Sequence, residues 1–127
     1  MAKQYTILLV EDEPEIARIF SMILKEAGFK VIITDSGKTT LEAVSKNIPD
    51  LVLLDLVIPD MDGYQVLKKI KSNQKLKAVP VYVFSNLTQD HEAERAKKIG
   101  ANDYLIKSDY TPKQLVIKVK SILKISE

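Results

Sequence analysis

Two stretches decide how this chain folds: Ile7-Leu8-Leu9-Val10-Glu11-Asp12 and Leu51-Val52-Leu53-Leu54-Asp55. Each is a short, uninterrupted apolar run, which is typical of a strand buried on both faces of a parallel sheet. Each run ends in carboxylates, which lose much of their hydration at the end of a buried strand. If the two strands are neighbours, each pair of charges at about 4 Å and an effective dielectric near 20 repels by roughly 4 kcal/mol. Such a cluster indicates a functional site, because it requires a bound cation or shifted pKa values.

The remaining sequence alternates in the same way between apolar runs and amphipathic segments. We predict five strands, at about 5–10, 30–34, 51–55, 79–84 and 103–106. We predict five helices: at about 14–27, at about 38–46, after a loop at 56–63 where a helix carries Val66, Leu67 and Ile70, at about 89–99 and at about 112–123. Pro14 and the capping box Thr111-Pro112-Lys113-Gln114 mark two helix starts, and Gly28 and Gly100 mark two helix ends.

Five strands alternating with five helices predict an α/β fold. We expect a doubly wound, five-stranded parallel sheet of the flavodoxin-like kind, covered by helices on both faces. Right-handed crossovers favour the strand order 2-1-3-4-5. In that order the connections diverge between the first and third strands, and ligands of open α/β sheets bind at this switch point, outside the carboxyl ends of the strands. Glu11, Asp12 and Asp55 are expected there.

The composition narrows the class of protein. The 127 residues are expected to form one domain, with 46% hydrophobic and 28% charged residues, as in ordinary globular proteins. The net charge of +2 gives no argument for direct binding of nucleic acid. There is no cysteine, and no apolar stretch approaches the ~20 residues that span a bilayer. We expect a cytoplasmic protein without a membrane partner, whose output passes through protein contacts because no further domain follows the last helix.

The predicted strand ends carry groups that suit an ion and a phosphoryl group. Three carboxylates without a nearby histidine or cysteine favour a hard cation, and Mg²⁺ is the leading candidate. The fourth strand leads to Ser85 and the fifth to Lys107. A hydroxyl, an ammonium and a metal ion around one carboxylate suit in-line phosphoryl transfer, with Asp55 as the nucleophile.

A resemblance to a known family rests on features in sequence order. They are Glu11-Asp12, Asp55 in the run Asp55-Leu56-Val57-Ile58-Pro59-Asp60-Met61-Asp62-Gly63, Ser85, Tyr104 and Lys107. The chain resembles the receiver domain of bacterial two-component response regulators over essentially all of its length, in particular the stand-alone, chemotaxis-regulator-like kind. The sequence leaves open whether it is a stand-alone regulator, a phosphorelay shuttle or a domain of a longer regulator.

The resemblance implies a role for each of these residues. Asp55 is the phospho-acceptor, and Mg²⁺ is bound by Asp12, Asp55 and the backbone carbonyl of Val57, with Glu11 acting through water. Lys107 pairs with Asp55 or its phosphoryl group, and Ser85 moves to bond that group. Tyr104 then rotates inward and remodels the surface of the fourth helix, fifth strand and fifth helix.

The resemblance also implies partners. The phosphoryl donor is a histidine kinase or a histidine phosphotransfer protein, and the remodelled surface controls a downstream target protein or forms a phosphorylation-dependent dimer. The chain is then not an enzyme, beyond assisting its own phosphorylation and dephosphorylation.

Two residues depart from the family pattern. The family commonly has proline after this lysine, where the chain has Ser108, so we expect no cis peptide there and a less constrained lysine. The residue after the serine is usually small, whereas this chain has Asn86. We group Asn86 with the phosphate-binding residues and expect its side chain to hinder access to the phosphoryl group.

Three other functions remain open. A degenerate receiver would bind partners without phosphorylation, although the intact acidic set argues against it. A phosphohydrolase with an aspartyl nucleophile would need a second acid in a D-x-D motif, which Asp55-Leu56-Val57 lacks. A flavin-binding electron carrier would need a phosphate-cradling loop where residues 11–15 are acidic. For other polar residues we prefer structural roles: Asp60 and Asp62 in a turn, Glu13 and Glu15 at a helix start, and His91 exposed.

Overall fold

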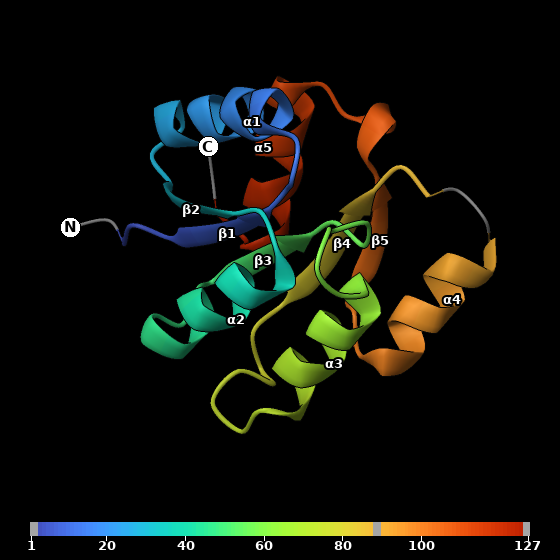
Figure 1. The fold of residues 1–127 in the computed structure, drawn as a ribbon. Coiled ribbons are helices and arrows are strands. Elements are labelled where there is room, and N and C mark those ends of the chain that lie inside the picture. The colour runs from blue at the N-terminus through green and yellow to red at the C-terminus, as the bar shows by residue number, and fades with distance from the viewer. Residues whose placement is uncertain (1–2, 88–89, 126–127) are drawn as a thin grey trace.

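The computed structural model describes residues 3–87 and 90–125, which form a central sheet with helices on both faces (Figure 1). The strands are β1 (Thr6–Val10), β2 (Lys30–Thr34), β3 (Leu51–Leu54), β4 (Val81–Ser85) and β5 (Asp103–Ile106). They pair in parallel in the order β2-β1-β3-β4-β5. The predicted doubly wound sheet is confirmed.

The helices are α1 (Pro14–Glu26), α2 (Gly37–Lys46), α3 (Gly63–Ser72), α4 (Asp90–Ile99) and α5 (Pro112–Ile122), with a short 3₁₀ turn, η1 (Lys107–Asp109). Helices α1 and α5 cover one face of the sheet, and α2, α3 and α4 cover the other (Figure 1). Side chains alternate between these faces along β1, so that Ile7 and Leu9 pack beneath α1 and α5 while Leu8 and Val10 pack beneath α2 and α3. Burial on both faces explains the uninterrupted apolar runs.

Capping side chains fix where the helices begin. The predicted box at Thr111 is present, since its hydroxyl accepts from the N–H of Gln114. A second box at Ser36 starts α2 at Gly37, one residue before the predicted start. Asp60 reaches across to α2 and accepts from the N–H groups of Gly37 at 2.7 Å and of residue 38 at 2.9 Å. Asp62 caps α3, so both acids cap helices, a more specific structural role than the predicted turn.

The fourth strand differs most from its predicted bounds, because it begins at Val81 and not at Val79. Pro80 has no N–H to donate to the sheet. The backbone groups of Val79 are used elsewhere: its N–H donates to the Leu76 carbonyl at 2.9 Å, and its carbonyl accepts from Lys71 Nζ at 2.6 Å. The predicted start of the fourth helix at Gln89 lies outside the described residues, and η1 was not predicted.

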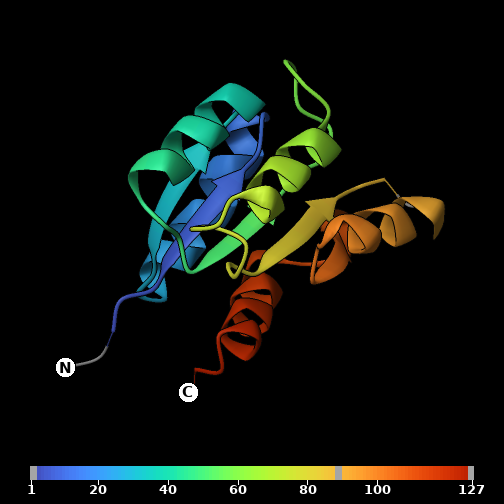
Figure 2. The same ribbon diagram turned by 90° about the horizontal axis from the view of Figure 1, so that it is seen from below.

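The chain ends and the candidate site lie at opposite ends of the sheet. Figure 2 shows that the strand arrows point away from the end where both termini lie. The loops at the carboxyl ends of the strands therefore form a separate surface, on which the predicted site residues lie. Within residues 3–87 and 90–125, no helix has the length and apolar character needed to cross a membrane.

Candidate functional site

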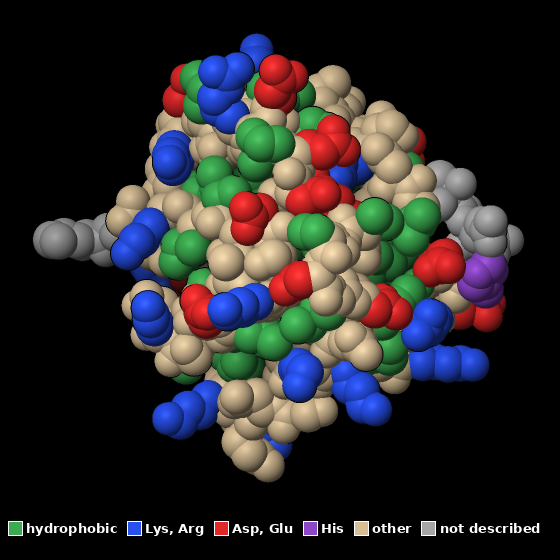
Figure 3. Space-filling view, viewed as in Figure 1, with side chains coloured by type: hydrophobic (Ala, Val, Ile, Leu, Met, Phe, Trp, Pro, Cys, Tyr) green, Lys and Arg blue, Asp and Glu red, His purple; other side chains and the backbone are tan. Residues whose placement is uncertain are grey.

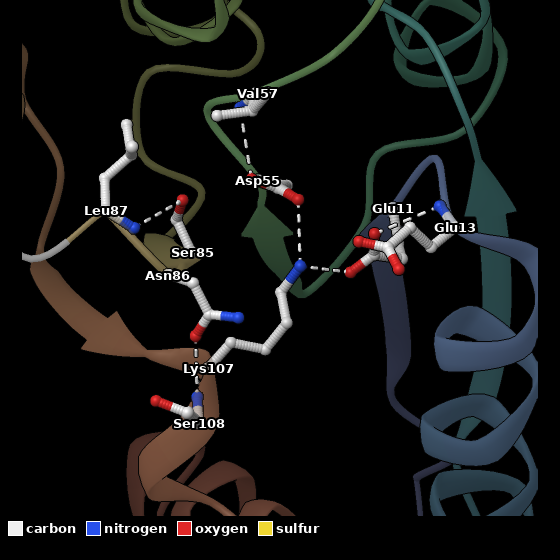
Figure 4. Close-up of polar contacts among 9 residues, drawn as sticks. All are labelled: Glu11, Glu13, Asp55, Val57, Ser85, Asn86, Leu87, Lys107 and Ser108. Atoms are coloured by element: carbon white, nitrogen blue, oxygen red, sulfur yellow. Dashed lines mark hydrogen bonds and ion pairs between the residues drawn. The ribbon is translucent and has the colours of Figure 1, made fainter.

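A buried lysine lies between two buried acids where β1, β3 and β5 end (Figure 4). Lys107, the first residue of η1, places its ammonium 2.8 Å from Asp55 Oδ2 and donates a second hydrogen bond to Glu11 Oε1. The exposed fractions of Glu11, Asp55 and Lys107 are 2%, 6% and 7%. Buried charges persist when paired in this way, because each compensates the lost hydration of the other. The expected pairing of Lys107 with Asp55 is present, and Glu11 is an additional partner.

Asp12 completes an acidic cluster with Glu11 and Asp55. Each of these residues offers a carboxylate oxygen within 4.8 Å of the others, which is close enough for one metal ion. Asp12 is exposed, whereas Glu11 is buried and already uses both oxygens, one for Lys107 and the other for the N–H of Glu13 at 3.1 Å. The cluster lies at the switch point between β1 and β3, as the topology predicted.

The loop after β3 holds Asp55 in place. The Asp55 N–H donates to the Val10 carbonyl at 3.2 Å, and its Oδ1 accepts from the Val57 N–H at 3.1 Å. The loop closes where the Gly63 N–H donates to the Leu56 carbonyl at 3.1 Å. A Cβ atom on Gly63 would lie 2.5 Å from Leu56 Cα, so this close approach requires glycine.

Ser85 and Asn86 form another wall of the site. Ser85 is buried at the end of β4, and the N–H of Leu87 donates to its Oγ at 3.4 Å. Asn86 Oδ1 accepts from the N–H of Ser108 at 2.8 Å, and the Lys107–Ser108 peptide is trans, as expected. The open cavity between these residues has a volume of about 270 Å³ and is lined by Asp12, Glu13, Asp55, Val57, Ser85, Asn86, Leu87 and Lys107. At roughly 30 Å³ for each water in the liquid, a tetrahedral anion fits there together with solvent.

Tyr104 links β5 to the loop after β4. Its hydroxyl donates to the Leu87 carbonyl at 2.8 Å, and its ring packs partly buried against the apolar cluster beneath α3 and α4. Burial raises the pKa of Tyr104, while a hydrogen bond with Ser85 acts in the opposite direction. The tyrosine therefore lies between the site and the α4 surface. Its rotation on phosphorylation stays a prediction.

Helix α4 is held to the protein by few apolar contacts. Ala96 is fully buried, and Ile99 is partly buried against the same apolar cluster. Polar contacts add to this, because the Tyr64 hydroxyl on α3 donates to the side-chain and backbone oxygens of Glu92. The Arg95 guanidinium lies 3.9 Å from the centroid of the Tyr64 ring. His91 is exposed, as predicted.

The protonation of the buried pair follows from burial and charge. Burial raises the pKa of Glu11, although the hydrogen bonds from Lys107 and from the Glu13 N–H pull it down. Burial alone would lower the pKa of Lys107, but the hydrogen bonds and charges of Asp55 and Glu11 outweigh it and raise the pKa. Lys107 is therefore an ammonium throughout the physiological pH range.

Acidic side chains gather in the upper middle of the face that carries the loops after β1 and β3 (Figure 3). Lysine and arginine side chains lie mainly around the left and lower edges of the same view. The local surplus of negative charge favours a cation at the carboxyl ends of the strands.

The fold and the site define an α/β protein with an acidic, lysine-containing site at the switch point of its sheet. The sequence profile of the family described as "Response regulator receiver domain" matches residues 7–120, and the chain belongs to this family. Receiver domains of two-component response regulators are signalling modules that act with histidine kinases and downstream effectors.

Individual relatives are moderately similar. The response regulator SaeR of Staphylococcus aureus is 34% identical over 117 residues, which are 92% of this chain and 50% of that protein. The chain thus spans about half the length of the curated relatives it matches. The structure of a phosphorylated cyanobacterial phytochrome response regulator, RcpA, is 30% identical with a TM-score of 0.82, covering 96% of this chain and 93% of that one. The Mn²⁺-bound response regulator Rcp1 is 29% identical with a TM-score of 0.81, covering 94% of each chain.

The structure brings together most of the residues predicted for the site. One cavity is lined by Asp12, Asp55, Ser85, Asn86 and Lys107. Glu11 does not line it but accepts a hydrogen bond from Lys107. Val57 also lines the cavity, whereas Tyr104 does not line it and bonds the Leu87 carbonyl in the loop after β4. No local sequence pattern predicts the hydrogen bond between Asn86 and Ser108.

Proposed function

We propose that Asp55 accepts a phosphoryl group from the phosphohistidine of a histidine kinase or histidine phosphotransfer protein, with Mg²⁺ bound at Asp12, Asp55 and the Val57 carbonyl. The observation that carries this proposal is the buried Lys107 ammonium, 2.8 Å from Asp55 Oδ2, at the wall of a cavity that Ser85 also lines. Of the relatives, RcpA was solved phosphorylated and Rcp1 with Mn²⁺ bound, which supports both parts of the proposal.

Asp55, Lys107 and Ser85 have different roles in the proposed phosphoryl transfer. A carboxylate oxygen of Asp55 forms a bond to phosphorus while the bond from phosphorus to the imidazole nitrogen breaks, and its electron pair returns to that nitrogen. Lys107 offers a positive charge to the transferred oxygens, and the hydroxyl of Ser85 can turn to donate a hydrogen bond. Neither group gives up a proton, so both act by positioning charge.

The donor set fits a hard cation. The carboxylates of Glu11, Asp12 and Asp55 approach within 4.8 Å, and oxygen ligands of this kind suit Mg²⁺. Asp12 and Asp55 both line the cavity, whereas Glu11 is buried and does not line it. We therefore assign direct binding to Asp12 and Asp55, and contact through water to Glu11. When bound, the ion would draw charge from the phosphoryl oxygens and offset the repulsion among the acids.

The response would start at Ser85 and end at the surface of α4, β5 and α5. If Ser85 bonds the phosphoryl group, its 3.4 Å contact with the Leu87 N–H changes, and Leu87 also holds the Tyr104 hydroxyl. We propose that Tyr104 then rotates inward and that α4, with its few apolar contacts, shifts. A downstream target protein, or a second copy of the chain, would bind the altered surface.

The direct test is intact mass spectrometry after incubation with Mg²⁺ and acetyl phosphate. We expect one added phosphoryl group, which chelation of Mg²⁺ or Asp55→Asn abolishes. The matched control is Asp62→Asn on the same loop, because asparagine caps α3 as well as aspartate does and the phosphoryl group should still be added. An unchanged mass of the parent protein would refute the proposal and leave a phosphorylation-independent binding module. Steady release of phosphate from a small ester would favour a phosphohydrolase.

A further inference from the structure

Asn86 and Ser108, the two departures from the family pattern, are bonded to each other. The backbone N–H of Ser108 donates to Asn86 Oδ1 at 2.8 Å (Figure 4). This bond joins the residue after Ser85 to the residue after Lys107. It requires an N–H at position 108, which proline would not have. The two departures therefore form one structural feature.

The bond also fixes which way the Asn86 amide faces. A primary amide carries an oxygen acceptor on one side and an NH₂ donor on the other, and its neighbours decide between the two orientations. A backbone N–H can only donate, so the amide oxygen must face Ser108. The NH₂ group must then face the other way, and Figure 4 shows the nitrogen on the side of the Lys107 side chain. Asn86 also lines the cavity around Asp55, so this donor lies near an anion that binds there.

The cavity needs such a donor when an anion occupies it. The Lys107 ammonium shares its donors with Asp55 and Glu11, and the Ser85 hydroxyl, which accepts from the Leu87 N–H, has a single proton to donate. A phosphoryl group brings three further oxygens, each able to accept hydrogen bonds. A neutral amide adds a donor without repelling the cation that the acids attract.

We propose that Asn86 Nδ2 donates a hydrogen bond to the phosphoryl group on Asp55, and that the Ser108 N–H orients the amide for this purpose. The inference rests on the proposed function and deepens it: Asn86 is a binding residue and Ser108 a positioning residue that acts through it. The side chain expected to hinder access is instead a ligand of the phosphoryl group.

The test is the affinity for beryllofluoride, a tetrahedral anion that mimics a phosphoryl group, measured by NMR titration with Mg²⁺ present. Hydrogen bonds to charged groups change affinity roughly tenfold to a hundredfold. Asn86→Ala should therefore weaken binding about tenfold, and Asn86→Asp should weaken it further because an anionic oxygen replaces the donor. Mg²⁺ affinity without beryllofluoride should stay the same in Asn86→Ala, which separates loss of a donor from general distortion of the site.

Ser108 provides a matched pair of variants. Ser108→Pro removes the N–H and should lose part of the beryllofluoride affinity, whereas Ser108→Ala keeps the N–H and should bind as the parent does. Adding Ser108→Pro to Asn86→Ala should cause no further loss, because the proline acts through Asn86.

Two results would overturn this inference but not the proposed function. In the first, the parent and Asn86→Ala proteins bind beryllofluoride equally. In the second, Asn86→Ala loses as much affinity for Mg²⁺ as it loses for beryllofluoride. A parent protein that neither binds beryllofluoride nor takes a phosphoryl group would instead overturn the proposed function, and this inference with it.

Discussion

Replacing Lys107 with methionine should destabilise the protein strongly, although methionine has nearly the same length and is more apolar. The substitution leaves Glu11 and Asp55 buried beside each other without a cation. At the 2.8 Å between Lys107 Nζ and Asp55 Oδ2, an effective dielectric of about 20 gives an attraction of about 6 kcal/mol. The cost of burying the ammonium offsets part of this attraction. Removing one partner of a buried ion pair typically costs about 3 to 5 kcal/mol, and we expect a loss of that size at neutral pH.

The loss should depend on pH and on Mg²⁺. Burial already raises the pKa of Glu11, and removing Lys107 takes away one of the causes that lower it. When the folded pKa of an acid lies above its unfolded pKa, the protein loses stability as pH rises from the lower value to the higher one. Acidification should therefore restore part of the loss. A divalent cation bound to the folded state should do the same, and should stabilise Lys107→Met more than the parent.

Urea unfolding of four proteins would measure these effects: the parent, Lys107→Met, Asp55→Asn and the double variant. In the double variant one of the two unpaired acids is neutral, so the loss caused by Lys107→Met should shrink by about 1 to 3 kcal/mol in the Asp55→Asn background. The reasoning fails if the unfolding free energy of Lys107→Met lies within about 1 kcal/mol of that of the parent at neutral pH. It also fails if neither a lower pH nor added Mg²⁺ reduces the loss of unfolding free energy in this variant.

Three further predictions concern the same site and its supports. The pKa of Lys107 is raised above its usual 10.5. The stability that this lysine contributes is therefore complete below pH 10.5 and is lost as pH rises through the folded pKa. At strongly alkaline pH the urea midpoint should fall more in the parent than in Lys107→Met. Tyr64→Phe should cost about 1 kcal/mol and speed amide exchange in α4, whereas Tyr82→Phe, whose hydroxyl makes no hydrogen bond within the described residues, should do neither. Gly63→Ala should cost about 1 to 3 kcal/mol in urea unfolding because its Cβ meets the Leu56 backbone, and a cost no larger than that of Gly37→Ala, which meets only the flexible Met61 side chain, would contradict this.

The sequence predicts the sheet and the position of the acids for one physical reason. A strand buried on both faces must be apolar at every residue, as β1 and β3 are. Once the strand order is known, a residue that directly follows a strand is located within a few ångströms. Asp55 and Lys107 follow β3 and β5, which lie on either side of β4, so the strand order places both residues at the same edge of the sheet. That the two side chains pair is implied only by the resemblance to receiver domains.

What the sequence does not predict is how each side chain is used. That Glu11 is buried and bonded to Lys107 while Asp12 is exposed depends on how the chain leaves β1. The bond between Asn86 and Ser108 joins two loops 22 residues apart, and its partners are found only when both loop conformations are known. The observed start of β4 differs from the predicted start for a similar reason, because the Val79 carbonyl accepts a hydrogen bond from Lys71.

The charges at the switch point link the two parts of the proposed function, the cation and the phosphoryl group. Three carboxylates and one ammonium give this cluster a formal charge of −2. A phosphoryl group on Asp55 would replace one negative charge with about two. The net charge of the cluster would then be about −3 without a cation and about −1 with a divalent cation. Cation and phosphoryl group must therefore favour each other's binding, and the coupling is reciprocal. Before either is bound, Lys107 provides the compensating charge. In the proposed function, its flexible side chain would let the same ammonium move with the negative charge from the carboxylate to the phosphoryl oxygens.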